Sequence, residues 1–250
     1  MREKMQEPRS LLILLVLIVV AAALSSPFGT PEIAAFAKDF LPAAATLVSA
    51  YVGAWYGAAL VKQSAKDDER KRNIGAGVRA MFTLWRQVNV VAQIQLDVVS
   101  KYRDNPAAPV VMPPVEYPLN DVARLNLDEL AFLLDQGNSK VLEDLSIAEQ
   151  RFVHAVETIR ERSRLHLAEI QPVLERLIPK GGPIPHAELE AALGPRLFSL
   201  LIDKTRMLIY QVDDAVETLD SAASGLYMAL KSMFPEVKFP APSQANSDNG

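Results

Sequence analysis

The chain contains no cysteine among its 250 residues, and its charges show no excess of the basic type. The absence of cysteine excludes disulfides, thiolate metal sites and cysteine nucleophiles. The formal net charge is -4, with acidic and basic residues interspersed. Because binding to phosphate backbones needs clustered Lys and Arg, we expect no nucleic-acid partner.

The sequence also lacks a recognisable catalytic pattern. No glycine-rich phosphate loop follows a strand pattern, and no serine lies in a nucleophile elbow. Two HxxE pairs start at His154 and His166, but these histidines are twelve residues apart and therefore ~120° apart around one helix. One helix cannot present both to the same metal ion. We therefore expect no enzyme activity, cofactor, metal or small-molecule substrate.

A long apolar run over residues 40–61 is the strongest feature that is present. It holds 22 residues without a charge, and about 20 apolar residues cross a hydrocarbon core of about 30 Å. Asp39 and Pro42 suit the start of a helix here. A basic cluster follows and places this end in the cytoplasm: Lys62, Lys66, Arg70, Lys71 and Arg72. The pattern predicts a transmembrane helix.

A shorter apolar segment over residues 10–26 precedes this run, behind a polar terminus at residues 1–9. Two interpretations remain open: a first transmembrane helix, which we favour, or a cleaved signal peptide. Both place residues 25–38 outside and the rest of the chain after residue 61 inside. With two spans, residues 10–61 form a membrane hairpin in the cytoplasmic (inner) membrane, with both termini cytoplasmic.

Small residues recur every four positions in the second predicted span. Ser49, Gly53 and Gly57 have the spacing that lets two helix backbones approach closely in lipid. The pattern is compatible with packing against the first span and with a dimer interface. We treat these three residues as the candidate surface for helix packing in the membrane.

The remaining sequence predicts an all-α, elongated antiparallel bundle over residues 62–234. Three long amphipathic helices are expected at 74–103, 139–178 and 195–234, with short ones at 121–136 and 186–193. Gly75 and Gly77 weaken the first pattern, and Pro172 is expected to kink the second. Five prolines exclude a helix from the loop at 104–119, and the tail at 235–250 is expected to be disordered.

Two polar residues interrupt the apolar stripe of the 139–178 helix. Ser163 and His166 are expected to form a polar layer that specifies helix register or association. Trp85 is a further candidate for association through the first long helix. The nearby arginines alternate with glutamates and predict a solvated face: Arg151, Arg160, Arg162 and Arg164.

Together these patterns predict a membrane-anchored, non-enzymatic interaction or scaffold protein. Its expected partners are the lipid bilayer and either another protein or a second copy of the chain. The alternative hypothesis is a membrane effector or signal transducer, in which a rearrangement of the bundle reaches the spans through residues 62–77.

Overall fold

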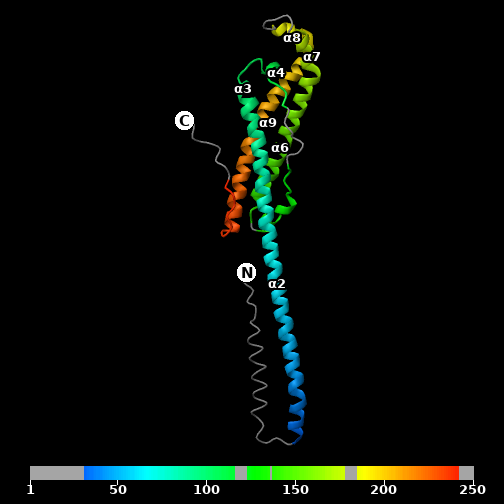
Figure 1. The fold of residues 1–250 in the computed structure, drawn as a ribbon, viewed down its shortest axis with the longest axis vertical. Helices are drawn as coiled ribbons and strands as arrows, with labels where there is room; N and C mark the ends of the chain where they lie inside the picture. The colour runs from blue at the N-terminus through cyan, green and yellow to red at the C-terminus, as the bar shows by residue number, and fades with distance from the viewer. Residues whose placement is uncertain (1–30, 116–122, 136, 178–184, 242–250) are drawn as a thin grey trace. The chain divides into compact units, whose positions relative to one another are not determined.

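The structure is a computed structural model that describes residues 31–115, 123–135, 137–177 and 185–241 (Figure 1). In this part of the chain every regular element is helical, which confirms the all-α prediction. The chain divides into two units, Met1–Asp68 and Glu69–Gly250. The predicted polar terminus at 1–9 and first span at 10–26 lie outside the described residues.

Helix α2 (Pro31–Ile94) accounts for all that is described of the first unit and continues into the second. It begins earlier than the sequence predicted, because Pro31 occupies the first turn, where a missing N–H costs nothing. Pro42 consequently lies inside the helix, and the Thr46 hydroxyl donates a hydrogen bond of 2.8 Å to its carbonyl. No helix among the described residues is both long enough and apolar enough to cross a membrane. The membrane hairpin therefore remains a prediction.

Helix α2 runs through Gly75 and Gly77 without a break, contrary to the weak point expected there. The reason lies in packing, because Gly77 is buried against Leu230 of α9 (Pro195–Met233). After Ile94 the chain continues as a single π-helical turn, η1 (Gln95–Val99), and a short helix, α3 (Ser100–Tyr102). The predicted end near Arg103 agrees with this.

The core of the second unit is formed by α2, α6 (Ser139–Leu165) and α9, whose apolar faces meet. Fully buried side chains from all three helices include Met81, Leu84, Phe152, Ile159, Leu208 and Leu219. Helix α6 extends through a π-helical turn, η4 (His166–Ile170), into α7 (Gln171–Leu177). This irregular turn ends two residues before Pro172, where a disturbance of the helix was expected.

A second, smaller cluster lies where α7, α8 (His186–Leu193) and the start of α9 meet. Its buried members are Ile170, Leu189, Leu193, Phe198 and Leu201. Gly194 separates α8 from α9 with φ of +77°, a conformation that L side chains rarely adopt. The sharp turn at this glycine therefore allows both helices to contribute to one cluster.

Two segments between the long helices differ from the sequence predictions. The proline-rich loop contains one helical turn, α4 (Ala108–Val111), because Pro109 lies at its start, where proline is tolerated. The short helix expected at 121–136 is instead a 3-10 turn, η3 (Asp128–Leu130), followed by α5 (Phe132–Asp135). Residues 116–122 and 136 lie outside the described part.

The C-terminal segment also differs from the prediction of a disordered tail beginning at residue 235. Residues 234–241 are described, and Phe234 and Phe239 are 6% and 8% exposed. The Phe234 ring lies 6.4 Å from the rings of both Phe132 and Phe239, between centroids. This aromatic contact supplies the apolar burial that the segment needs to pack. Residues 242–250 lie outside the described part.

Candidate functional site

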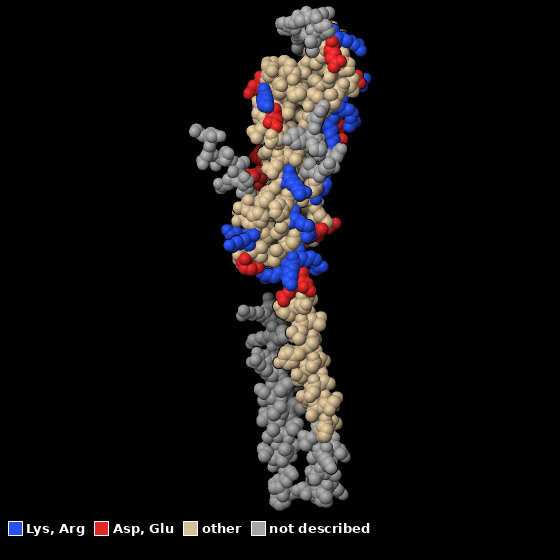
Figure 2. Space-filling model, viewed as in Figure 1, with Lys and Arg blue, Asp and Glu red and all other residues tan. Residues whose placement is uncertain are grey.

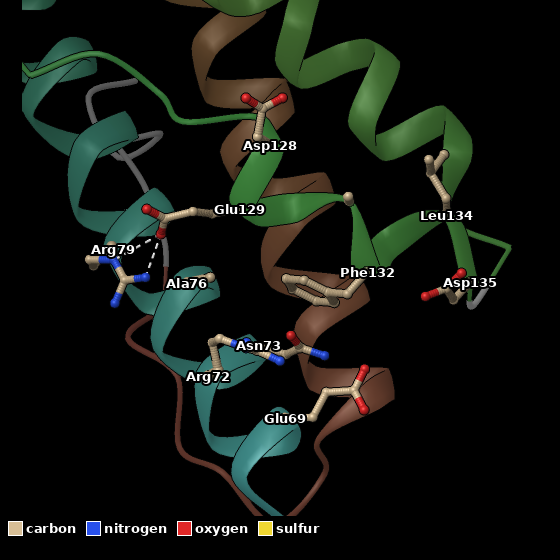
Figure 3. Close-up of a pocket in the computed structure, with 11 residues that line it drawn as sticks. Glu69, Arg72, Asn73, Ala76, Arg79, Asp128, Glu129, Phe132, Leu134 and Asp135 are labelled. Atoms are coloured by element: carbon tan, nitrogen blue, oxygen red, sulfur yellow. Dashed lines mark hydrogen bonds and ion pairs between the residues drawn. The ribbon is translucent and has the colours of Figure 1, made fainter. Parts of the chain in front are cut away.

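A surface cleft opens between the start of the second unit's α2 and the segment that carries η3 and α5 (Figure 3). We call it the neck cleft, and its volume is about 660 Å³, within the range of about 300–1,000 Å³ that is common for ligand sites. Seven lining residues are charged or polar, namely Glu69, Arg72, Asn73, Arg79, Asp128, Glu129 and Asp135, and four are apolar, namely Ala76, Ala131, Phe132 and Leu134.

Most of the charge in the neck cleft is acidic. Arg79 pairs with Glu129 across one wall, with its Nε 3.1 Å from Oε2, and this hydrogen bond lowers the pKa of Glu129 (Figure 3). Arg72 has no ion-pair partner among the described residues, and neither do three carboxylates of the lining: Glu69, Asp128 and Asp135. The cleft can therefore accept a cationic or polar group. No set of three His, Asp or Glu residues suited to a metal ion occurs in the described part.

All five residues of the predicted basic cluster are exposed on α2, and Figure 2 shows Lys and Arg side chains gathered at the lower end of the bundle. Lys62, Lys66 and Lys71 are exposed. Arg70 pairs with Glu236 of the C-terminal segment, and its guanidinium lies 5.5 Å from the Phe234 ring centre. Arg72 lines the neck cleft. Arg70 thus has a contact with the C-terminal segment, and Arg72 lines the cleft, in addition to the role in topology predicted for the cluster.

A second candidate site lies inside the bundle. Ser163 and His166 are each 7% exposed, and the adjoining Arg162 is fully buried, whereas the sequence placed it on a solvated face. Thr205 of α9 is 2% exposed and lies beside Lys204, which pairs with Glu161 of α6. We call Arg162, Ser163, His166 and Thr205 the buried polar layer.

Arg162 bonds to backbone carbonyls of the proline-rich loop. Its Nη1 donates to the Pro113 carbonyl at 2.9 Å, and its Nη2 donates to the carbonyls of Pro109 and Met112 at 3.2 and 2.6 Å. The neighbouring Ser163 Oγ accepts a hydrogen bond of 2.9 Å from the Val115 amide. Among the described residues no carboxylate pairs with Arg162, and burial lowers the pKa of this arginine to about 10.

Three polar atoms of this layer have no hydrogen-bond partner in the described structure: Arg162 Nε, His166 Nδ1 and Thr205 Oγ1. Burial and the positive charge of Arg162 lower the pKa of His166 to about 4. The imidazole is therefore neutral near pH 7. A buried polar group without a hydrogen-bond partner costs free energy. The buried polar layer therefore stabilises the fold less than apolar side chains at the same positions would.

A further polar contact fixes the next segment of the chain. Gln87 of α2 is fully buried, and its Nε2 donates to Glu149 of α6 at 2.8 Å and to the Ala123 carbonyl at 3.0 Å. Glu149 also accepts the Leu125 amide at 3.3 Å and pairs with Arg124. Helix α6 thus holds the connection between α3 and α6 at two places, 108–115 and 123–125.

The other predicted association residues lie at the surface or half-buried. Ser49, Gly53 and Gly57 are exposed, and a Cβ added at either glycine would have no described atom within 4 Å. Trp85 is half-buried, its Nε1 has no partner in the described part, and its ring packs edge-on against Phe82. The roles of these residues in association remain predictions.

The chain matches no family model, no curated protein and no solved structure at a significant level. Any functional argument therefore rests on the geometry of the chain itself.

Sequence reasoning missed Arg162 although a signal was present. Buried positions of α6 and η4 follow alternating steps of three and four: Leu145, Ala148, Phe152, Ala155, Ile159, Arg162 and His166. Such a heptad frame defines the face that packs against partner helices. A charge pattern with the neighbouring glutamates obscured the fact that Arg162 belongs to this frame.

Proposed function

We propose that this chain is a membrane-anchored, non-enzymatic interaction protein whose helical bundle binds another protein at the cytoplasmic surface. The observation that carries the proposal is the exposure of large apolar side chains on the first unit's part of α2. Leu47, Leu60 and Val61 are 72%, 69% and 69% exposed, and Tyr51 and Tyr56 are 61% and 59% exposed. Burying such side chains is worth about 1.5–3 kcal/mol each, and a bilayer would provide this burial.

The sequence around these residues supports the same proposal. Residues 40–61 contain no charged side chain, whereas residues 62–72 are largely charged and exposed. A change from apolar to basic at one helix end is typical of a span that ends at the cytoplasm. The neck cleft follows within the next turns of α2, and its acidic lining suits a partner segment that carries Lys or Arg.

The absence of cysteine makes a direct test possible. Single cysteines at Ala54 and Gln63 are introduced, and membranes are treated with a maleimide reagent that cannot cross them. We expect Ala54→Cys to react only after detergent is added. Gln63→Cys should react in inside-out vesicles and stay unreacted in right-side-out ones. Rapid labelling of Ala54→Cys in intact membranes, or recovery of the chain in the soluble fraction, would contradict the anchor.

The partner is tested by the composition of the complex that a mild detergent extracts from native membranes. A second protein in stoichiometric amount supports the interaction function. Charge reversal in the cleft, Asp128→Lys with Asp135→Lys, should release that protein, whereas Glu143→Lys on the exposed part of α6 should not. Retention of the partner by the cleft variant would place the interaction elsewhere.

The continuity of α2 favours a second candidate function, that of a membrane effector or signal transducer. One unbroken helix connects residues 40–61 with the bundle core. A helix without a hinge transmits rotation and translation along its length, so movement of the bundle would reach the proposed span. A pure homo-oligomer in the extraction experiment would favour this candidate.

A further inference from the structure

We propose that residues 108–115 form a displaceable strap, and that the face of α6 beneath it is a docking site for a proline-containing segment of a partner protein. Arg162 and Ser163 mark this face. The inference rests on the proposed function only in requiring a protein partner. It concerns a different surface from the neck cleft.

Four hydrogen bonds hold the strap through its backbone. Arg162 donates to three of its carbonyls, and Ser163 accepts from one of its amides. Such contacts do not depend on the identity of the strap's side chains. Another segment with the same backbone shape can therefore make the same four hydrogen bonds, as in other cases of main-chain recognition of peptides.

Apolar burial of the strap is uneven, and Val110 and Val115 pack against the two hydrophobic clusters only in part. Only Ala108 and Met112 are buried, whereas Val111 is 47% exposed and Pro113 is also exposed. Residues 103–107, which lead into the strap, are all exposed, and Arg103 at their start pairs with Asp213 of α9. A segment with few buried apolar contacts opens at a lower free energy than the helices beneath it.

The closed state also carries a cost that opening relieves. A fully buried guanidinium without a carboxylate among the described residues has lost its hydration for hydrogen bonds to neutral carbonyls. Arg162 Nε and His166 Nδ1 have no partner there. When the strap leaves, water can hydrogen-bond these groups. The free-energy difference between the closed and open states is therefore smaller than it would be if every buried polar group had a partner in the closed state.

The backbone of the strap defines the partner segment. A helical turn over Ala108–Val111 ends at Met112, whose φ of -65° and ψ of 119° begin an extended stretch through two prolines. Prolines favour such an extended backbone and lower the entropy lost on binding. The expected ligand is thus a short segment with a large apolar side chain followed by prolines.

Hydrogen exchange of the full-length chain in detergent tests the strap. The variant Arg162→Met leaves three carbonyls without their donor, so the amides of residues 110–112 and 115 should exchange at least 10-fold faster. Amides in the middle of α6 and α9 should keep their rates. The matched control is Arg164→Met, because Arg164 is exposed on the same helix. Equal acceleration across the bundle, or unchanged exchange in the strap, would overturn the displaceable strap.

Binding in trans tests the docking site. A fluorescein-labelled peptide with the sequence of residues 106–115 is titrated into full-length Met112→Ala, whose own strap has lost its buried side chain. We expect saturable binding to this variant, at least 10-fold weaker binding to the unaltered chain, and none to Met112→Ala with Arg162→Met. If strap exchange rises in Met112→Ala but the peptide does not bind, the face does not accept a partner segment.

Discussion

Gly77 of α2 faces Leu230 of α9 so closely that a Cβ at Gly77 would lie 2.6 Å from Leu230 Cδ2. Leu230 is fully buried and therefore has little room to move. Glycine has the poorest helix propensity apart from proline, but it lies here because α2 and α9 leave no room for a Cβ. Close approach of the backbones explains why α2 can remain unbroken at this position.

Replacing Gly77 with alanine should destabilise the bundle. Overpacking costs about 1–3 kcal/mol, and the better helix propensity of alanine returns about 1 kcal/mol. The control is Gly75→Ala, whose Cβ would meet only the Arg79 guanidinium at 3.4 Å and which should be neutral or stabilising. Urea denaturation followed by circular dichroism measures both. A Gly77→Ala variant as stable as Gly75→Ala would show that Leu230 yields without cost.

His166 should make the stability of the bundle depend on pH between about 6.5 and 4. Its pKa is lowered to about 4 in the folded chain, by burial and by Arg162, so the unfolded chain binds a proton first as pH falls. Above pH 6.5 the free energy of unfolding is not reduced by this linkage. It falls by roughly 3 kcal/mol as the pH approaches 4. His166→Gln should remove this part of the pH profile, whereas His154→Gln, at an exposed position, should retain it. Identical profiles for both variants would mean that His166 is not desolvated.

Insertions in the exposed part of α2 between residues 62 and 68 should separate the two proposed functions. Two inserted alanines rotate the following helix by about 200°, whereas seven complete almost two turns and nearly restore the phase. A transducer should lose its response with two residues and recover with seven. An anchored interaction protein should retain its partner in both variants, as measured by co-purification.

Gly53 and Gly57 provide the test of association within the membrane. Leucine at both positions should weaken self-association in a membrane dimerisation assay, because it prevents close approach of two backbones. The control places leucine at Ala58 and Ala59, which are also exposed on α2 but lie on another face of the helix from Gly53. An unchanged signal in the glycine variant would remove this surface from the proposed interface.

Much of the bundle follows from apolar periodicity, because burial of a helix face leaves a repeat that sequence reasoning can detect. The long helices α6 and α9 and the end of the first helix near Arg103 were predicted on this basis. The start of the helix was predicted near Pro42, but the helix begins at Pro31. Proline is common in the first turn of a helix, and the sequence does not show which of the two prolines occupies that turn.

The contacts that sequence reasoning missed are those made between segments far apart in the chain. Arg162 is buried because carbonyls some 50 residues earlier accept its hydrogen bonds, and no local pattern contains that information. Residues 235–241 likewise pack because the Phe234 ring contacts both Phe132 and Phe239. Ser163 and His166 could be placed in the interior from the stripe alone, but their partners could not.

The contact between Arg70 and Glu236 joins the first turn of the second unit to the segment that follows α9. A domain whose two connecting segments lie close together can be attached to another chain without distortion. The segment from residue 69 to residue 241 is therefore suited to transplantation onto an unrelated helix, and to circular permutation by joining its ends. A fluorescent protein fused after residue 241 would begin five residues beyond Glu236, the residue that pairs with Arg70 of α2.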